Sequence, residues 1–455
     1  MIRLNTNPII TYLNKPNTRL VNFVFLNYLI QRYQLINFIP MEKKTTKIAI
    51  IGAGISGLTA ALALEKEGYS PIIYEKTDSV GGRVKTDMVD GYQLDHGFQV
   101  LLDAYPLARK YLDYSALELQ KFLPGAQIFN QGKSSVLGDP LRSIQFLFPT
   151  LFSTIGSFSD KWNILRLNST VKKKSLNEIF NEEETSTHTF LKSSGFSTEI
   201  IEQFFKPFFS GIFLEPNLET SSRMFQFVYK MFGTGYAVLP KAGIGAIPTQ
   251  LFNKLEQTKI TFNRSVESCS DNSIVFSDGH NVAPDYTIIA TDASPLIPNL
   301  RNQQLNWQSS DTLYFTTKIR KIEDPLIGLI SDKDALINNV FYHTSLVTSQ
   351  RGTDELLSVT IVKEHNLTEY DLIQKVKDDL KTYCGITTER YLKHYPIKMA
   401  LPKLNDLRYS LIPSETRLTE RTFLAGDYLL NGSLNAAMLS GEMAALGVID
   451  AIEKS

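Results

Sequence analysis

The feature that most constrains the fold of this 455-residue chain is a glycine-rich turn between a strand-like run and a helix-like run. The apolar run Lys47–Ile51 (KIAII) is typical of a central parallel strand, and it leads directly into Gly52–Gly57 (GAGISG). A helical pattern covers Leu58–Glu67, and a second short apolar run, Pro71–Tyr74, ends at Glu75. This order of strand, GxGxxG turn, helix, strand and acid predicts a Rossmann-type unit for a dinucleotide.

Each residue of this unit has a physical role toward a dinucleotide. Gly52 permits the tight turn, Gly54 lets the backbone approach a pyrophosphate, and Gly57 lets the helix pack close to the strand. The start of the helix offers unpaired N–H groups and the positive end of its dipole to the phosphates. Glu75 can accept hydrogen bonds from a ribose 2′-hydroxyl, and its charge would repel a 2′-phosphate.

A second glycine-rich element follows the acid. Gly81-Gly82-Arg83 begins six residues after Glu75, and the arginine fork can pair with a phosphate. Leu94–Gln99 (LDHGFQ) comes next. With these elements the chain resembles the flavin amine oxidase, phytoene desaturase and protoporphyrinogen oxidase superfamily of FAD-dependent oxidoreductases. In that superfamily the Gly-Gly-Arg element after the ribose acid is characteristic and favours FAD over NAD.

The C-terminal end of the chain agrees with this resemblance. Arg421–Ala425 is strand-like and runs into Gly426 and Asp427, and a helix rich in small residues opens at Asn435 and Ala436. The resemblance implies that Asp427 binds the ribitol chain and that the start of this helix faces the pyrimidine end of the flavin. A helix dipole there would stabilise negative charge on a reduced flavin.

The middle of the chain matches as well. Val238–Leu251 resembles the Pro-Lys-Gly-Gly segment of the superfamily, with Ala242 in place of the usual first glycine. A meander of three strand-like runs follows: Lys259–Ser268, Ser273–Ser277 and Asn281–Ala290. Asp278-Gly279 predicts a hairpin turn between the last two runs. In the superfamily the residue that matches Val266 contacts adenine.

The resemblance implies one noncovalent FAD, since neither Cys269 nor Cys384 lies near the C-terminal motif. The two cysteines are far apart, and the six histidines lack metal-ligand spacing, so neither a disulfide scaffold nor a metal site is expected. The residues expected to bind FAD are Gly52, Ala53, Gly54, Ile55, Ser56, Gly57, Glu75, Lys76, Gly81, Gly82, Arg83, Gly97, Phe98, Val266, Gly426, Asp427, Asn435 and Ala436.

The positions of these motifs divide the chain. We expect an α/β fold in which a Rossmann-type FAD-binding domain, discontinuous over 45–100, 236–300 and 396–455, carries an inserted α+β substrate domain. The inserted domain would comprise 101–235 and 301–395. Its Phe-rich stretch Phe204–Phe213 fits either a helical core or an apolar tunnel for a lipophilic substrate. Residues 1–40 contain no Gly, Ala, Asp or Glu, and we expect them to be an N-terminal extension outside the fold.

The composition of the chain argues against two classes of partner, nucleic acid and the interior of a membrane. The chain has 47 Lys and Arg against 47 Asp and Glu, which argues against nucleic acid as a partner. No run of about 18 apolar residues is uninterrupted by polar ones, which argues against a membrane-spanning helix. We therefore expect a cytoplasmic protein, with a peripheral membrane contact left open.

The catalytic residues are harder to name. His96, inside the LDHGFQ element, and Lys241 are candidates, although structural or surface roles suit both. Amine oxidases of the superfamily place a lysine near the start of the strand that we expect at Thr312–Ile319. The preceding Ser309-Ser310-Asp311 contains no lysine, which weighs against an amine oxidase.

The leading hypothesis is therefore an FAD-dependent dehydrogenase or desaturase of a lipophilic small molecule, with oxygen or a quinone as the electron acceptor. The alternatives are an amine oxidase that uses molecular oxygen, a non-redox flavin-dependent sugar mutase, and a cofactor-free binding protein of the same fold.

Overall fold

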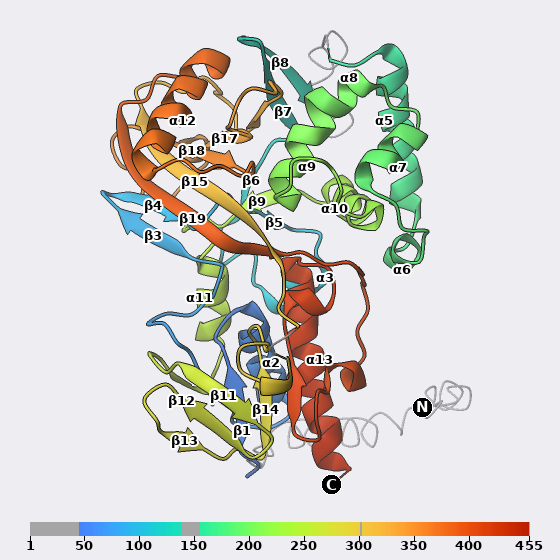
Figure 1. Ribbon diagram of the computed structural model, residues 1–455. Helices are drawn as coiled ribbons and strands as arrows, with labels where there is room; N and C mark the ends of the chain where they lie inside the picture. The colour runs from blue at the N-terminus through green and yellow to red at the C-terminus, as the bar shows by residue number, and fades with distance from the viewer. Residues whose placement is uncertain (1–44, 139–154, 301–302, 455) are drawn as a thin grey trace, which may run out of the picture. The chain divides into compact units, whose positions relative to one another are not determined.

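In the computed structural model, which describes residues 45–138, 155–300 and 303–454, a five-stranded parallel sheet carries the glycine-rich turn (Figure 1). The strand order is β10-β2-β1-β14-β20, and every neighbouring pair is parallel. The strands are β1 (Ile48–Ile51), β2 (Ile72–Tyr74), β10 (Lys259–Thr261), β14 (Tyr286–Ile289) and β20 (Thr422–Leu424). They come from three distant stretches of the chain, so the predicted Rossmann-type α/β fold is confirmed, whereas the N-terminal extension lies outside the described residues.

The two faces of this sheet bury different layers, because successive strand residues point to opposite sides. Ile48 and Ile50 of β1 belong to the core shared with helices α2 (Ile55–Lys66) and α13 (Leu434–Glu453). Ala49 and Ile51 of the same strand pack instead with residues of an antiparallel meander. The sheet is thus covered on one face by helices and on the other by strands.

The meander corrects two sequence expectations. It consists of β11 (Val266–Ser270), β12 (Ser273–Phe276) and β13 (Asn281–Val282), with the predicted turn at Asp278-Gly279. Lys259–Ser268 is two strands in two different sheets, since Asn263 has a positive φ of 53° and Arg264 N–H bonds to the carbonyl of Glu75. Asn281–Ala290 is likewise divided, into β13 and the parallel strand β14.

A seven-stranded sheet of order β19-β15-β18-β17-β16-β7-β8 joins the two predicted insertions. β16 pairs in parallel with β7, and this pairing links the insertions directly. Its strands are β7 (Gly125–Asn130), β8 (Lys133–Gly138), β15 (Trp307–Thr317), β16 (Ile327–Ile330), β17 (Asn339–Tyr342), β18 (Glu355–Ile361) and β19 (Arg390–Pro402). Helix α12 (Glu369–Cys384) packs on it through Leu372, Val376 and Leu380. Strand β19 runs across residue 396, where the sequence analysis places a domain boundary. That boundary stays a prediction.

A cluster of helices stands beside this sheet (Figure 1). Its members are α5 (Phe158–Lys173), α6 (Leu176–Phe180), α7 (Thr187–Ser193), α8 (Thr198–Ile200), α9 (Lys206–Phe213) and α10 (Ser222–Thr234), with a π-helical turn at Ile201–Phe205. Serine caps start several of them; Ser157 and Asp160 form a capping box on α5, as Ser175 and Glu178 do on α6. The helices are thereby delimited by local sequence signals.

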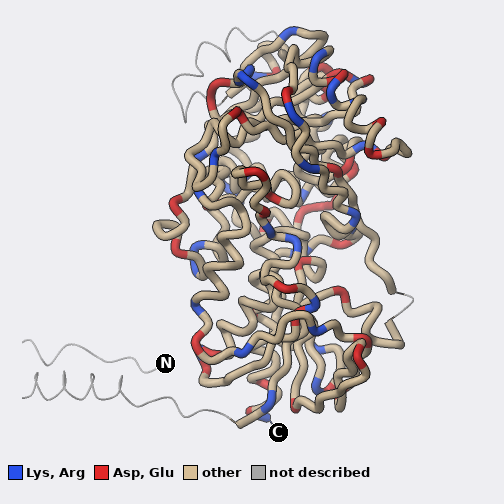
Figure 2. Tube along the Cα trace, turned by 90° about the vertical axis from the view of Figure 1, so that its left-hand side faces the viewer, with Lys and Arg blue, Asp and Glu red and all other residues tan. Residues whose placement is uncertain are grey.

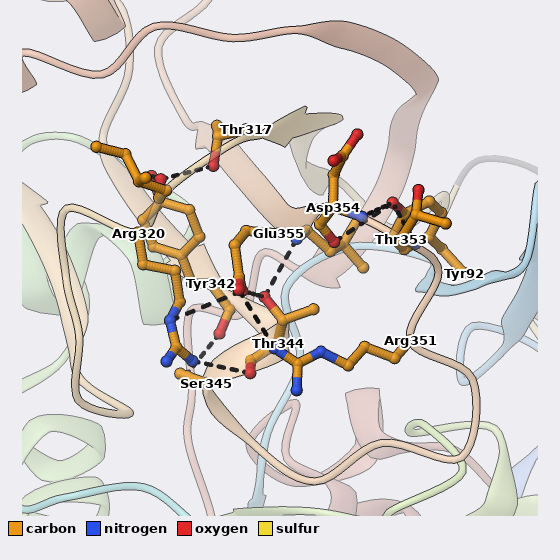
Figure 3. Close-up of polar contacts among 12 residues, drawn as sticks. Tyr92, Thr317, Arg320, Tyr342, Thr344, Ser345, Arg351, Thr353, Asp354 and Glu355 are labelled. Atoms are coloured by element: carbon orange, nitrogen blue, oxygen red, sulfur yellow. Dashed lines mark hydrogen bonds and ion pairs between the residues drawn. The ribbon is translucent and has the colours of Figure 1, made fainter.

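A β-hairpin formed by β3 (Thr86–Val89) and β4 (Tyr92–Asp95) is tied to the larger sheet through Tyr92. The Tyr92 hydroxyl accepts hydrogen bonds from the N–H groups of Thr353 and Asp354, at 3.2 and 2.8 Å. In the same region Glu355 accepts from the Thr344 hydroxyl and pairs with Arg351 (Figure 3). The ten residues labelled in that view do not line the cavity described below, so we assign this network to anchoring the hairpin.

The distribution of charged residues and the hydropathy of the helices agree with the expectations drawn from the composition. Lys and Arg are interspersed with Asp and Glu over the described chain and do not gather on one side of the view in Figure 2. Within the described ranges, no helix has both the length and the apolar character that crossing a membrane requires.

Candidate cofactor and substrate cavity

A cavity of about 1710 Å³ opens at the carboxyl edge of the parallel sheet. β1 leads into Gly52, β2 into Glu75, and β20 into Gly426 and Asp427, and all four residues line the cavity. Ligand sites in such sheets lie at this edge because the turns there are free to shape a pocket. The predicted cofactor residues that line the cavity are Gly52, Gly54, Ile55, Ser56, Glu75, Lys76, Gly81, Gly82, Arg83, Gly97, Phe98, Gly426 and Asp427.

The glycines of the first turn differ in what surrounds them. An added Cβ on Gly57 would overlap the carbonyl oxygen of Gly52, so this glycine is required by helix packing. Gly52 has a φ of +103°, which favours glycine. An added Cβ on Gly54 would meet nothing within 4 Å, although its backbone lines the cavity. Gly54 therefore leaves open the space that a pyrophosphate needs.

Glu75 holds this turn in place. Its Oε2 accepts the N–H of Ala53 at 2.8 Å, and its Oε1 accepts the N–H and the hydroxyl of Thr77 at 2.9 and 2.8 Å. A carboxylate has about four acceptor positions, so at least one remains for a ribose hydroxyl. The side chain is nearly buried, yet it still borders the cavity.

Arg83 and Asp427 meet across the cavity from opposite ends of the chain. Arg83 Nη2 lies 2.6 Å from Asp427 Oδ1, and Nη1 donates to the carbonyl of Ala400 at 3.0 Å. The guanidinium also lies 5.2 Å from the ring centre of Trp307. Because Asp427 is almost buried while Arg83 is partly exposed, the cation can turn toward a phosphate while the carboxylate stays fixed.

The start of α13 faces the cavity through other residues than those expected. Asn435 accepts the N–H of Leu107 at 3.0 Å, and the N–H of Ala436 donates to the Ser433 hydroxyl at 3.1 Å. Ser433 caps the helix and lines the cavity. The predicted residues outside the lining are Ala53, Gly57, Val266, Asn435 and Ala436.

Sequence reasoning missed further lining residues. Ala290, Thr291 and Asp292 follow β14, so the strand-end rule would have found them had the strand been placed in the parallel sheet. Trp307 and residues 400–402 carried no such signal, because β19 reaches the cavity only through its long pairing with β15.

The cavity continues into an apolar chamber between α9 and α10. Phe205 and Phe209 are buried in the aromatic core, where the ring centres of Phe209 and Phe225 lie 4.6 Å apart. Phe205 and Phe209 also line the cavity, together with Phe204 of the π-helical turn, Phe208 and Ile212 of α9, and Met224, Val228 and Phe232 of α10. The Phe-rich stretch is thus a helical core whose rings also border the cavity, and its use as a tunnel for a lipophilic substrate stays a prediction.

Of the two catalytic candidates, only His96 lines the cavity. Its Nε2 lies 2.9 Å from Asp87 Oδ1. Lys241 does not line the cavity; its Nζ pairs with Glu118 Oε2 at 2.9 Å. In the described part of the chain no group of three or more His, Cys, Asp or Glu side chains could hold a metal ion.

Comparison with known proteins places this geometry in a family. The model of the flavin containing amine oxidoreductase family matches residues 55–449, so the chain belongs to that family. It is a flavin-containing oxidoreductase of the superfamily that its motifs resemble.

Among curated proteins, the chain is 23% identical over 309 residues to protoporphyrinogen oxidase 2, chloroplastic/mitochondrial, of Arabidopsis thaliana. That match covers 67% of this chain and only 57% of the relative. A 4,4'-diaponeurosporene oxygenase of Staphylococcus aureus is 30% identical over 90 residues, which are 20% of this chain and 18% of the relative.

Solved structures support the fold. Cyclohexylamine oxidase from Brevibacterium oxydans superposes with a TM-score of 0.65 at 14% identity, covering 90% of this chain and 99% of the other. Putrescine oxidase bound to putrescine gives 0.63 at 15% identity, covering 89% and 99%.

Proposed function

We propose that this protein is an FAD-dependent oxidoreductase that dehydrogenates a lipophilic small molecule, with hydride passing from a substrate carbon to flavin N5. The observation that carries the proposal is the continuity of the cavity, which extends from the glycine-rich turn to the aromatic wall of α9 and α10. A dinucleotide on the turn would bring its reactive ring toward the apolar chamber.

The residues present suit FAD. The open space at Gly54, the remaining acceptor position of Glu75 and the pair Arg83–Asp427 fit a pyrophosphate, a ribose and a ribitol in turn. We infer noncovalent binding, because Cys269 and Cys384 are both buried away from the cavity lining. When bound, the flavin supplies the two-electron acceptor that no side chain can provide.

An apolar substrate suits the chamber better than a small amine. The aromatic and aliphatic side chains of its wall favour an apolar body, whereas Glu184, Glu215 and Glu219, which also line the cavity, are the partners that an ammonium would use. The relatives named for protoporphyrinogen and for a carotenoid favour the same class. The amine oxidase reading keeps one supporting observation, because Lys398 of β19 lines the cavity beside the lysine-free start of β15.

We also propose that α5 brings the cavity to an anionic bilayer. Phe158, Trp162 and Leu165 lie on one face of the helix, are 79%, 67% and 43% exposed, and border the cavity. Lys161 and Arg166 on the same helix provide positive charge next to them. Exposed aromatics flanked by cations suit a lipid surface, from which an apolar substrate could enter directly.

The test starts from purified chain loaded with FAD. Under anaerobic conditions, carotenoid precursors, a porphyrinogen and a panel of amines are added separately, and the flavin absorbance near 450 nm is followed. We expect bleaching with an apolar compound, followed by recovery on adding oxygen or a quinone. Bleaching by amines alone, with hydrogen peroxide on reoxidation, would favour the amine oxidase instead, and a protein that binds no flavin would overturn the proposal.

A further inference from the structure

The cavity wall contains a histidine held by a carboxylate and a tyrosine. His96 Nε2 lies 2.9 Å from Asp87 Oδ1, and the Tyr395 hydroxyl donates to the other oxygen, Oδ2, at 2.8 Å. The rings of His96 and Tyr395 are in contact, with centres 4.6 Å apart. His96 and Tyr395 both line the cavity, so this arrangement belongs to its wall.

The carboxylate is suited to act as a fixed acceptor. Burial raises the pKa of Asp87, but the hydrogen bonds from His96 and Tyr395 and the charge of Lys393 together lower it below its usual value. Tyr395 has a raised pKa because of burial, the hydrogen bond to Asp87 and the nearby charge, so it stays a neutral donor. Asp87 is thus ionised, accepts the Tyr395 hydroxyl and lies beside His96 Nε2.

An ionised Asp87 decides which histidine nitrogen carries the proton. The nitrogen that faces a carboxylate at hydrogen-bond distance is N–H in the neutral ring, which leaves the other nitrogen with its lone pair. Here Nε2 is buried, lies 2.9 Å from Asp87 Oδ1 as an ion-pair contact and makes no hydrogen bond among the described residues. We infer from this contact that Nε2 carries the proton and that the lone pair of the neutral ring is on Nδ1.

The backbone under His96 is fixed as well. The neighbouring Asp95 is buried and accepts the Thr86 hydroxyl at 2.5 Å and the N–H of Ile244 at 3.0 Å. The Tyr314 hydroxyl donates to the main-chain oxygen of Asp95 at 2.9 Å. His96 follows directly after this anchored end of β4, and it lines the cavity together with Gly97 and Phe98.

We propose that His96 is a catalytic base of this site and that Asp87 and Tyr395 are its positioning residues. This inference rests on the proposed dehydrogenation. The substrate loses one hydrogen with its electron pair as hydride to the flavin and a second as a proton from the adjacent atom to His96 Nδ1, and a double bond forms between the two atoms. The imidazolium that results is paired with Asp87, and its partly exposed ring can return the proton to water.

Three carboxylates of the cavity wall near the expected flavin are already engaged. Glu75 accepts three hydrogen bonds at the glycine turn, Asp427 pairs with Arg83, and Asp292 accepts from Ser294. His96 is the only histidine among the described residues that line the cavity. A positioned general base contributes about 100-fold to 10,000-fold in rate.

The first measurement is independent of turnover. The full chain is labelled with ¹⁵N in its histidine rings, and long-range proton–nitrogen spectra are assigned with His96→Gln. We expect His96 as the Nε2–H tautomer in the wild type and a mixture of tautomers in Asp87→Asn. A His96 protonated at Nδ1 would overturn the inference, whatever the substrate proves to be.

The second measurement uses single-turnover flavin reduction by the best apolar substrate. We expect His96→Gln to slow reduction by about 100-fold or more while flavin content and substrate affinity stay unchanged. Added imidazole should restore part of the rate in His96→Ala, which a merely structural residue would not allow. His280→Gln is the matched control, since His280 also pairs with an aspartate, Asp278, but outside the cavity lining.

The two failures are distinguishable. If no compound reduces the wild-type flavin, the proposed function is wrong, and the tautomer spectra alone decide whether His96 is held as a base. If the wild type is reduced and His96→Gln is reduced at the same rate, the proposed function stands and His96 is not the proton acceptor.

Discussion

Single residues at the cavity edge carry charges that are paired within the protein. Arg83 contacts Asp427, the carbonyl of Ala400 and the face of Trp307 at the same time. The planar fork makes these contacts together, whereas the compact ammonium of a lysine has three donors but no flat face to lie against the indole and no fixed fork. The chemistry of this position therefore depends on the shape of the cation as well as on its charge.

Replacing this fork gives a residue-scale prediction. We expect Arg83→Lys to weaken FAD binding by about 10-fold or more, because a hydrogen bond to a charged group is worth about 1.5–3 kcal/mol. Fluorescence titration of the apoprotein with FAD measures the change. Arg390→Lys is the control, as Arg390 pairs with Asp90 on the surface; an equal loss in both variants would contradict the prediction.

Asp95 gives a prediction about pH. Burial raises its pKa to about 7, against hydrogen bonds from Thr86 and Ile244 that lower it. The folded state then holds a proton that the unfolded chain releases near pH 4, so this residue's contribution to stability is present at about pH 4 and is lost as the pH rises toward 7. We expect the loss to reach a few kcal/mol, about 1.4 per pH unit.

Urea midpoints measured between pH 4 and 8 test this contribution. Asp95→Asn should remove it and flatten the profile over this window, whereas the exposed Asp90→Asn in the same hairpin should leave the profile unchanged. If the profiles of wild type and Asp95→Asn run parallel, Asp95 does not titrate in this range.

At the scale of elements, α2 and α13 approach each other closely through small residues. An added Cβ on Gly441 would overlap the carbonyl oxygen of Ser56, in the first turn of α2. The helices that carry the glycine turn and the Ser433 cap are thus held in one geometry. The contact between α2 and α13 brings residues from opposite ends of the chain to the wall of the same cavity.

We expect Gly441→Ala to destabilise the protein by about 1–3 kcal/mol, because backbone atoms must move to relieve the overlap. The free energy of unfolding in urea measures the effect. Asp450→Ala, at an exposed position of the same helix, is the control. A neutral Gly441→Ala would mean that the two helices can separate without cost.

Helix α5 gives the second prediction at this scale. Phe158→Ser, Trp162→Ser and Leu165→Ser together should abolish cosedimentation with vesicles that contain anionic lipids, since their exposed apolar area is lost. Thermal unfolding of the variant should be unchanged, because the side chains are exposed. Equal cosedimentation of variant and wild type would contradict a lipid contact through α5.

For the whole molecule, the cavity links two sheets that the chain builds from interleaved stretches. A ligand that spans it binds only the folded state and must stabilise it. At 100 times its dissociation constant, FAD would add about 2.7 kcal/mol. We expect a rise of several degrees in the thermal midpoint with FAD.

Gly54→Ala separates this binding from folding. The added methyl group meets nothing in the protein, so the midpoint without FAD should match the wild type. The methyl group occupies the space proposed for the pyrophosphate, so the rise with FAD should vanish. An undiminished rise in Gly54→Ala would place the cofactor elsewhere.

The Rossmann unit and most of the cofactor residues that line the cavity were predictable from the sequence. Gly52, Gly54 and Glu75 act within about two dozen residues of one another, so their roles follow from local backbone geometry. The start of α13 was likewise predictable from the local sequence. Its capping residue, Ser433, was missed because the cap is the residue just before the helix and the predicted helix began later.

Which distant residues meet could be learned only from the folded chain. The pairing of β15 with β19 brings Trp307 and residues 400–402 to the cavity, and the approach of β19 to the β3–β4 hairpin joins Tyr395 to Asp87 and His96. Such contacts depend on strand register and on helix packing over hundreds of residues, which no local pattern encodes.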